Sequence, residues 1–194
     1  MSKSYKHIPN LEEAIKQRQL VLCGRRYVGV SLSDLRAPEW AQVKIQNFMK
    51  TPKNFLLYCG NPGIGKTYLC ASLIEWAMTT FDSFRYWNES ELLKKIRSGM
   101  DEYKGDYLET LKHLIDDQLV MFDDLGSCGL NDWRKEIIFD AIDERYNSML
   151  PTIITSNFSL KEIEKNFHPR VCSRLFDKDN TIIEILDGID LRKN

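Results

Sequence analysis

The segment GNPGIGKT, at residues 60–67, limits what this chain can fold into more than any other stretch. Its three glycines leave successive backbone N–H groups free of side-chain bulk, so that they can point at one anion. The segment fits the pattern G-x-x-x-x-G-K-S/T, in which the lysine reaches the β- and γ-phosphates of a nucleotide and the hydroxyl binds Mg²⁺. We therefore expect a nucleoside triphosphate here, with Lys66 on its phosphates and Thr67 on the metal. The expected nucleotide contacts are Gly60, Asn61, Pro62, Gly63, Ile64, Gly65, Lys66, Thr67 and Tyr68.

The residues around this loop have the order that the mechanism needs. The apolar run FLLYC (55–59) predicts a buried strand before the loop, and a helix is expected from Gly65 to about Thr79. The positive N-terminal end of that helix adds to the attraction for phosphate. The chain contains no NKxD pattern of the kind that reads guanine, so ATP is the expected nucleotide.

A second acidic site follows the loop. The run LVMFDD (119–124) places two aspartates at the carboxyl end of a buried strand, where ligands bind in doubly wound sheets. One carboxylate there can hold Mg²⁺, and a second can orient and deprotonate an attacking water. We assign Asp123 to the metal and Asp124 to the water. An ordinary strand that ends in a polar turn is the alternative, and the phosphate loop upstream disfavours it.

Short apolar runs alternate with helical segments through the rest of the chain. Further strands are expected at 83–87, 152–157 and 181–186, and a helix with a buried apolar stripe at 131–148. Apolar strands that alternate with helices indicate the α/β class, with a mostly parallel sheet covered on both faces. The phosphate loop makes this a P-loop NTPase fold.

Composition and charge limit the function classes. The 194 residues suffice for one domain, and 43% hydrophobic with 28% charged residues is typical of a soluble globular protein. The net charge of -1 excludes a whole-protein basic field, so a nucleic-acid site has to be a local patch or a product of assembly. The five cysteines form no CxxC pair, which argues against a zinc site or a disulfide scaffold. No apolar run approaches membrane-spanning length, so we expect a cytoplasmic protein without a membrane partner.

Three stretches together resemble a known family. GNPGIGKTYL, LVMFDDLG and FDAIDERYNSMLPTIITSN are similar to the AAA+ ATPases of the DnaC/DnaI helicase-loader and IstB-like group. The resemblance covers about residues 27–194 and implies a five-stranded sheet in which the TIITSN strand lies between the two phosphate-site strands. It also implies that Asn157 senses the γ-phosphate or the attacking water, and that the AAA+ lid domain is absent or vestigial. Residues 1–26 are expected to form a short N-terminal helical segment, a candidate for partner binding.

The resemblance also assigns arginines. In FHPRVCSRLF, Arg170 and Arg174 are four residues apart and share one helix face. The resemblance implies that Arg174 projects into the ATP site of a neighbouring subunit, which requires self-association, and Arg170 is a further candidate. A solvated helix face is the alternative for both. Arg192 matches the family's second sensor arginine, although Leu191 stands where the family has tyrosine and a frayed basic tail explains it equally well.

A DNA contact is expected after the second strand. SELLKKIRSGM presents Lys94, Lys95 and Arg97 opposite its apolar residues, and Lys104 follows. In the loader group this region faces single-stranded DNA, and a ring that repeats a few charges per subunit can reach useful affinity. A solvated helix face is again the alternative.

These motifs lead to one hypothesis and three alternatives. An ATP-hydrolysing, magnesium-dependent loader of a hexameric DnaB-type replicative helicase onto single-stranded DNA fits all of them. An IstB-like ATPase that regulates transposition on duplex DNA shares nearly all of them. A small-molecule phosphotransferase would need an arginine-rich substrate lid, which the sequence does not show. An ATP-dependent binding module with little turnover would keep its function without Asp124.

Overall fold

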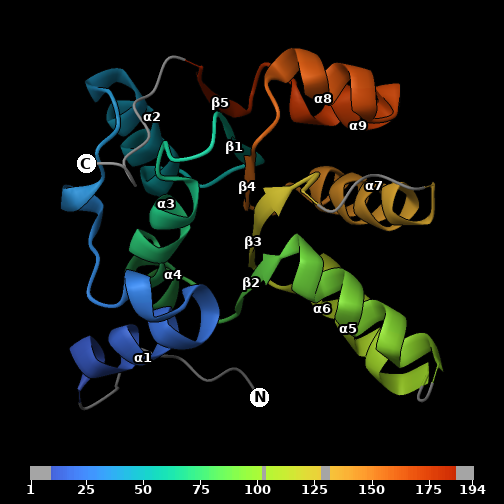
Figure 1. The fold of residues 1–194 in the computed structure, drawn as a ribbon, viewed down its shortest axis with the longest axis horizontal. Helices are drawn as coiled ribbons and strands as arrows, with labels where there is room; N and C mark the ends of the chain where they lie inside the picture. Colours follow the sequence, from blue (N-terminus) through green and yellow to red (C-terminus); the bar gives the residue numbers. More distant parts are fainter. Residues whose placement is uncertain (1–9, 102–103, 128–131, 187–194) are drawn as a thin grey trace.

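The computed structural model describes residues 10–101, 104–127 and 132–186. Five parallel strands form one sheet in the order β2-β3-β4-β1-β5, with helices on both faces (Figure 1). The expected α/β class and five-stranded P-loop architecture are confirmed. The strands are β1 (Phe55–Gly60), β2 (Phe84–Asn88), β3 (Leu119–Leu125), β4 (Thr152–Ser156) and β5 (Thr181–Ile185).

The central position of β4 brings the expected site residues to one edge of the sheet. Thr152 of β4 pairs with Phe55 of β1 on one side and with Val120 of β3 on the other. Because the three strands run parallel, their carboxyl ends lie at the same edge. The phosphate loop after β1, the aspartates that end β3 and Asn157 after β4 therefore leave the sheet together.

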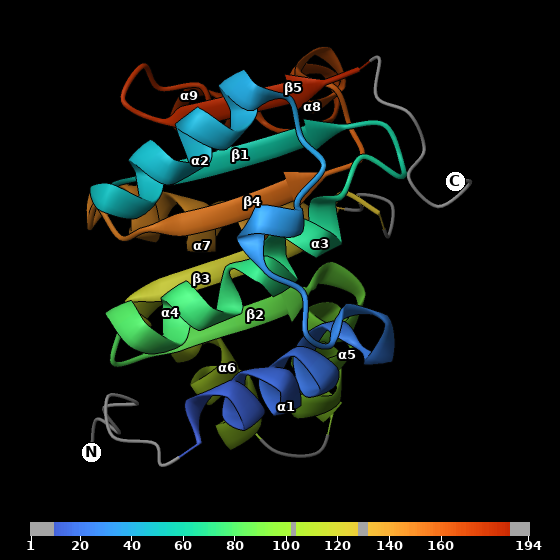
Figure 2. The ribbon, with the colours of Figure 1, turned by 90° about the vertical axis from the view of Figure 1, so that its left-hand side faces the viewer.

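The helices form a layer on each side of the sheet, and Figure 2 shows the face covered by the first four. These are α1 (Leu11–Cys23), α2 (Glu39–Lys50), α3 (Lys66–Ser72) and α4 (Ile74–Thr80). The opposite face carries α5 (Glu89–Asp101), α6 (Lys104–Asp116), α7 (Asp132–Asn147), α8 (Leu160–Asn166) and α9 (Pro169–Leu175). Two 3₁₀ turns, η2 (Arg25–Tyr27) and η3 (Leu32–Asp34), connect α1 to α2.

A strand of this sheet contributes side chains to two hydrophobic cores, because successive side chains point to opposite faces of the sheet. In β1, Leu57 and Cys59 pack into the core under α7 to α9, whereas Leu56 and Tyr58 pack into the core under α2 to α4. All of these side chains are fully buried. The strand that carries the phosphate loop is therefore held from both sides.

The helix expected from Gly65 to Thr79 is divided at Leu73. The amide of Leu73 bonds to the carbonyls of both Leu69 and Cys70, at 3.1 and 3.2 Å, and its ψ flattens to -3°. The Ser72 hydroxyl bonds to the Leu69 carbonyl at 2.8 Å. Such back-bonding by a serine hydroxyl bends a helix, so α3 and α4 follow the sheet as two short segments.

Arg145 joins three segments at the end of the sheet opposite the site. Its side chain is fully buried at the end of α7. The guanidinium donates five hydrogen bonds, to the Thr152 hydroxyl and to the carbonyls of Leu114, Ile115, Asp117 and Pro151. Burial lowers its pKa to about 10, and the nearby acidic groups oppose that shift.

Among the described residues, no helix has both the length and the apolar character needed to cross a membrane.

Candidate nucleotide-binding site

The phosphate loop leaves β1 through glycines whose backbone conformations other residues rarely adopt. Gly60, Gly63 and Gly65 have φ angles of 137°, 93° and 93°. Gly60 is also required by packing, because a Cβ there would lie 1.9 Å from the carbonyl oxygen of Ile185 in β5. The loop therefore combines a tight turn with close contact to the edge strand, and α3 begins directly after it at Lys66.

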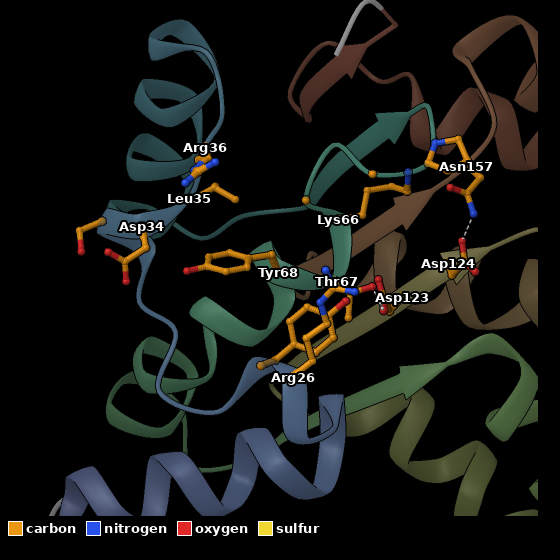
Figure 3. Close-up of a pocket in the computed structure, with 15 residues that line it drawn as sticks. Arg26, Asp34, Leu35, Arg36, Lys66, Thr67, Tyr68, Asp123, Asp124 and Asn157 are labelled. Carbon is orange, nitrogen blue, oxygen red and sulfur yellow. Dashed lines mark hydrogen bonds between the residues drawn. The ribbon is translucent and has the colours of Figure 1, made fainter. Parts of the chain in front are cut away.

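Lys66 folds back over the loop that carries it. The side chain is buried, and its Nζ donates to the carbonyl oxygens of Gly60 and Asn61, both at 2.8 Å. These carbonyls hold the ammonium within the pocket that Figure 3 draws. Phosphate oxygens are stronger partners for an ammonium than neutral carbonyls, so an anion in the loop would compete for the same group.

Asp123 is held by three hydroxyl groups from three different elements. Its Oδ2 accepts hydrogen bonds from Thr67 in α3 at 2.9 Å and from Tyr86 in β2 at 2.7 Å. Its Oδ1 accepts from the Thr155 hydroxyl in β4 at 2.6 Å. The carboxylate is nearly fully buried, and its orientation is fixed toward Thr67, the expected second metal ligand.

Asp124 faces the same pocket because its backbone departs from the strand. Its φ of 64° is left-handed, and the pairing of β3 with β4 shifts register between Phe122 and Leu125. In a regular strand two successive side chains point to opposite faces, whereas here both carboxylates lie at the pocket (Figure 3). The Asn157 amide donates a hydrogen bond to Asp124 Oδ1.

The environment of Asp124 raises the pKa of its carboxyl group. Burial is the main cause that raises the pKa of this carboxyl above 3.8, and the charge of Asp123 adds to it. The Lys66 charge and hydrogen bonds from Ser127 and Asn157 act in the opposite direction. A raised pKa is typical of a group placed to accept a proton.

These residues line one cavity of about 940 Å³. This volume lies within the range of sites for small molecules and cofactors. The cavity continues from the phosphate loop to Asp34, Leu35 and Arg36, which Figure 3 shows on the opposite side of Tyr68 from Thr67. Its lining residues are Arg26, Tyr27, Ser33, Asp34, Leu35, Arg36, Pro62, Gly63, Gly65, Lys66, Thr67, Tyr68, Asp123, Asp124 and Asn157.

Three of the loop residues expected at the nucleotide do not line the cavity. Gly60 lies buried against β5, Ile64 packs into the core under α2 to α4, and the Asn61 amide donates to the Leu186 carbonyl. None of these three is among the residues that line the cavity. Their side-chain contacts shape the loop and attach it to the end of β5.

The remaining expected residues lie outside the cavity or outside the described part of the chain. Arg174 in α9 makes an ion pair with Asp143 of α7 at 2.6 Å, and Arg170 is exposed at the start of α9. Neither lines the cavity. Lys94, Lys95 and Arg97 are exposed on α5, and Lys104 begins α6. Arg192 falls outside the described residues.

Sequence reasoning missed two groups of site residues. Tyr86 and Thr155 sit inside strands, where aromatic and β-branched residues are expected for packing alone. The segment from Arg26 to Arg36 carries no motif. Its charged residues were the only feature of the sequence that could have suggested a place at the site. The missed strand residues lie in the runs FRYWN and TIITS. Only the sheet order shows that these two strands flank β3 and its aspartates.

The site fits a magnesium nucleotide. Thr67 and Asp123 offer two oxygen ligands that already lie 2.9 Å apart. Within the described residues there is no cluster of three or more His, Cys, Asp or Glu side chains that could enclose a metal. Mg²⁺ is usually bound by one or two protein oxygens together with water and substrate phosphates, and this donor set suits that arrangement.

The chain matches known proteins over most of its length. It fits the family model of the IstB-like ATP binding protein over residues 31–178. The replicative helicase loader DnaI of Bacillus subtilis is 28% identical over 63% of this chain and 40% of that protein. The putative ATP-binding protein of insertion sequence IS232 from Bacillus thuringiensis is 26% identical over 68% of this chain and 51% of that protein. The chain thus spans about half the length of the curated relatives it matches.

A solved structure agrees with this relation. The crystal structure of the DnaC helicase loader has a TM-score of 0.68 and 27% identity to this chain, and the match covers 82% of this chain and 99% of that one. The sheet order, the phosphate loop and the paired aspartates identify the fold as that of the P-loop AAA+ ATPases. Because the family model covers well over half of its residues, including the whole phosphate loop and both aspartates, this chain belongs to the family of IstB-like ATP-binding proteins.

Proposed function

We propose that this protein hydrolyses ATP and loads a hexameric, DnaB-type replicative helicase onto single-stranded DNA. The observation that carries the proposal is the convergence of Lys66, Thr67, Asp123, Asp124 and Asn157 on one cavity. Similarity to proteins named as replicative helicase loaders supports the choice of partner.

Each of these residues has a role that its position favours. Lys66 would bind the β- and γ-phosphates, and Thr67 and Asp123 would hold Mg²⁺. Asp124 accepts the proton of the attacking water, and its raised pKa suits that task. Asn157 orients this carboxylate through the hydrogen bond that they share. Bound Mg²⁺ would contribute by neutralising charge that develops on the phosphate oxygens.

The base and sugar would occupy the end of the cavity that is lined by Asp34, Leu35 and Arg36. Leu35 offers an apolar surface there, and Asp34 and Arg36 offer polar groups near Tyr68. The phosphate loop fixes the other end of the nucleotide, so its length places the base against this segment. ATP binding would therefore connect the loop to the segment that follows α1.

We expect a second subunit to complete the site. Arg174 lies outside the cavity of its own chain, and an arginine supplied by a neighbour can raise the rate of phosphoryl transfer by roughly 10³ to 10⁵. Self-association would place Arg174, with Arg170 beside it, at the neighbour's γ-phosphate. Arg192 is a further candidate for contact with the same phosphate.

We expect single-stranded DNA to bind along the pair of helices α5 and α6. Lys94, Lys95 and Arg97 are exposed along α5, while Leu92, Leu93 and Ile96 are buried. Leu92 and Ile96 pack into the core under α7 to α9. An assembly that repeats these cations would give a positively charged path, and Lys104, the first residue of α6, is a further candidate contact. The segment at residues 1–26 remains the candidate for the helicase contact.

The second candidate function is regulation of transposition on duplex DNA. The family model itself and the relative from an insertion sequence favour this alternative. A binding module that uses ATP without turnover is the alternative of another class. It predicts that Asp124→Asn leaves function intact.

A pull-down with the replicative helicase separates these functions. We expect helicase to be retained in the presence of ATP and lost with Lys66→Ala, while single-stranded DNA is bound in preference to duplex. Retention of no helicase, with or without ATP, would contradict the loader. Preference for duplex DNA in the same preparation would instead support the transposition role.

A further inference from the structure

The cavity contains one arginine at its magnesium end that the expected mechanism does not use. Arg26 lines the cavity together with Thr67 and Asp123. Figure 3 shows its side chain extending from η2 toward these two residues. Arg26 therefore approaches the site from its own chain and from an element that the phosphate-loop motif does not include.

The Arg26 guanidinium is available for a ligand. In the part of the chain that the structure describes, it has no hydrogen-bond or ion-pair partner. Three other arginines are already paired, since Arg85 pairs with Asp117, Arg174 pairs with Asp143, and Arg145 donates to carbonyls. An exposed arginine usually contacts only solvent. Arg26 is exposed but also lines the cavity.

The charge balance of the inner site calls for a second cation. Lys66 is opposed there by two carboxylates, Asp123 and Asp124. A magnesium–triphosphate complex is itself an anion, so its binding would add negative charge to an already acidic corner. A guanidinium suits this place because its fork of N–H donors matches phosphate oxygens.

The turn that carries Arg26 is fixed to the nucleotide site by Gln19. This side chain is fully buried in α1. Its amide donates to the carbonyls of Val30 at 2.8 Å and Ala71 at 3.1 Å, and its oxygen accepts from Gly29 at 2.7 Å. Ala71 belongs to α3, the helix that follows the phosphate loop. Gln19 thus connects the segment around η2 to the loop's own helix.

We propose that Arg26 binds the distal phosphates of ATP from within the same subunit, beside the magnesium ligands. The proposal rests on ATP binding at the cavity and adds a phosphate contact to it. Arg26 would distinguish ATP from ADP, because the γ-phosphate lies at the end of the cavity that holds Thr67, Asp123 and Asn157. Its contribution is independent of assembly, unlike that of Arg174.

Arg26→Ala tests the proposal, with Arg25→Ala as the matched control. Arg25 is exposed in the same turn but does not line the cavity. Binding of magnesium ATP and magnesium ADP is measured by titration calorimetry on monomeric protein. We expect Arg26→Ala to weaken ATP binding by about 10- to 100-fold, as for a lost hydrogen bond to a charged group. ADP binding should change by less than about threefold, and Arg25→Ala should match the wild type.

Several outcomes would overturn the assignment. Equal ATP affinity of Arg26→Ala and Arg25→Ala would refute a phosphate contact, and an equal loss for ATP and ADP would place Arg26 at the base or sugar. A lower melting temperature of Arg26→Ala without nucleotide would give it a structural role instead. If the wild type binds no ATP, the proposed function itself fails, which a wild-type titration shows before any variant is made.

A mixing experiment tests whether the contact lies within one subunit. Lys66→Ala protein keeps Arg26 but has a defective loop of its own. Adding it to Arg26→Ala protein should leave ATP binding weak, since Arg26 of one chain cannot serve another. Recovery of tight ATP binding in the mixture would show that Arg26 acts between subunits and would contradict the proposal.

Discussion

The hydroxyl of Thr155 donates a hydrogen bond to Asp123 Oδ1 over 2.6 Å, and the same hydroxyl oxygen accepts the backbone N–H of Asp124 at 2.9 Å. One side chain of β4 thus fixes both the expected metal ligand and the backbone of the expected base. Thr155→Val keeps the shape and removes both bonds. We expect the Mg²⁺ concentration that supports nucleotide binding to rise about 10- to 100-fold, as is typical when the support of a metal ligand is lost.

Thr155→Ser is the matched control for this change. Serine keeps the hydroxyl, so magnesium-dependent nucleotide binding should stay within about threefold of the wild type. A magnesium titration of Thr155→Val that overlays that of the wild type would show that Asp123 needs no support from β4.

The sequence alone suggested a shared site for the polar residues that directly follow its apolar runs. Lys66, Asp123 and Asp124 could be expected at one edge of the sheet because parallel strands bring their carboxyl ends together, whereas Asn157 was expected there only from the family resemblance. The structure brings all four to one cavity. Thr155 could not be expected there, because an interior β-branched residue of a strand looks the same whether it supports a carboxylate or only packs.

The rest of the site was hidden because it depends on contacts distant in sequence. Arg26 reaches the cavity through the hydrogen bonds of Gln19 to Val30 and Ala71, which no local pattern predicts. Likewise, α6 packs against α5, and this pairing is a tertiary contact that the local sequence pattern does not specify. Local periodicity predicts an element, whereas packing decides where it ends.

Asp124→Asn should stabilise the fold without nucleotide at neutral pH. Burial raises the pKa of Asp124 above 3.8, so the ionised carboxylate lowers the free energy of unfolding as pH rises through that raised value. Asparagine also tolerates the left-handed backbone at this position. The melting temperature of Asp124→Asn should exceed that of the wild type at pH 7, and the gap should shrink toward pH 4.

A control for this effect is Asp82→Asn, an exposed aspartate in the loop before β2. This change should shift the melting temperature little at either pH. If Asp124→Asn is less stable than the wild type at pH 7, then the Asn157 and Lys66 contacts outweigh burial and the expected sign of the stability change is wrong.

Arg145→Met should strongly destabilise the fold while leaving the site chemistry intact. The substitution leaves the Thr152 hydroxyl and four carbonyls without their guanidinium donor. We expect a loss of about 3–5 kcal/mol in the free energy of unfolding, measured by urea denaturation. Arg145→Lys should also lose stability, because one ammonium cannot reach all three segments. The exposed Arg170→Met should lose less than about 0.5 kcal/mol.

Replacing the exposed cations of α5 should weaken DNA binding and make the remaining binding less sensitive to salt. With Lys94, Lys95 and Arg97 changed to alanine, each lost phosphate contact should reduce the slope of log affinity against log salt by about 0.7 for single strands. We therefore expect a slope smaller by about 2 per subunit, measured by fluorescence anisotropy with ATP present. An unchanged slope would place the DNA elsewhere. The matched control replaces the exposed residues Lys161, Lys165 and Lys178.

Arg174 has to exchange partners if it acts on a neighbouring subunit. Within its own chain it is paired with Asp143 at 2.6 Å, and both side chains are about one quarter exposed. Arg174→Ala should leave ATP affinity of dilute protein within about twofold but reduce turnover at assembling concentrations by roughly 10³. Asp143→Asn releases the arginine and should keep turnover at or above the wild-type level. If both variants lose turnover equally, the ion pair between α7 and α9 is the functional unit, and Arg174 does not serve a neighbour.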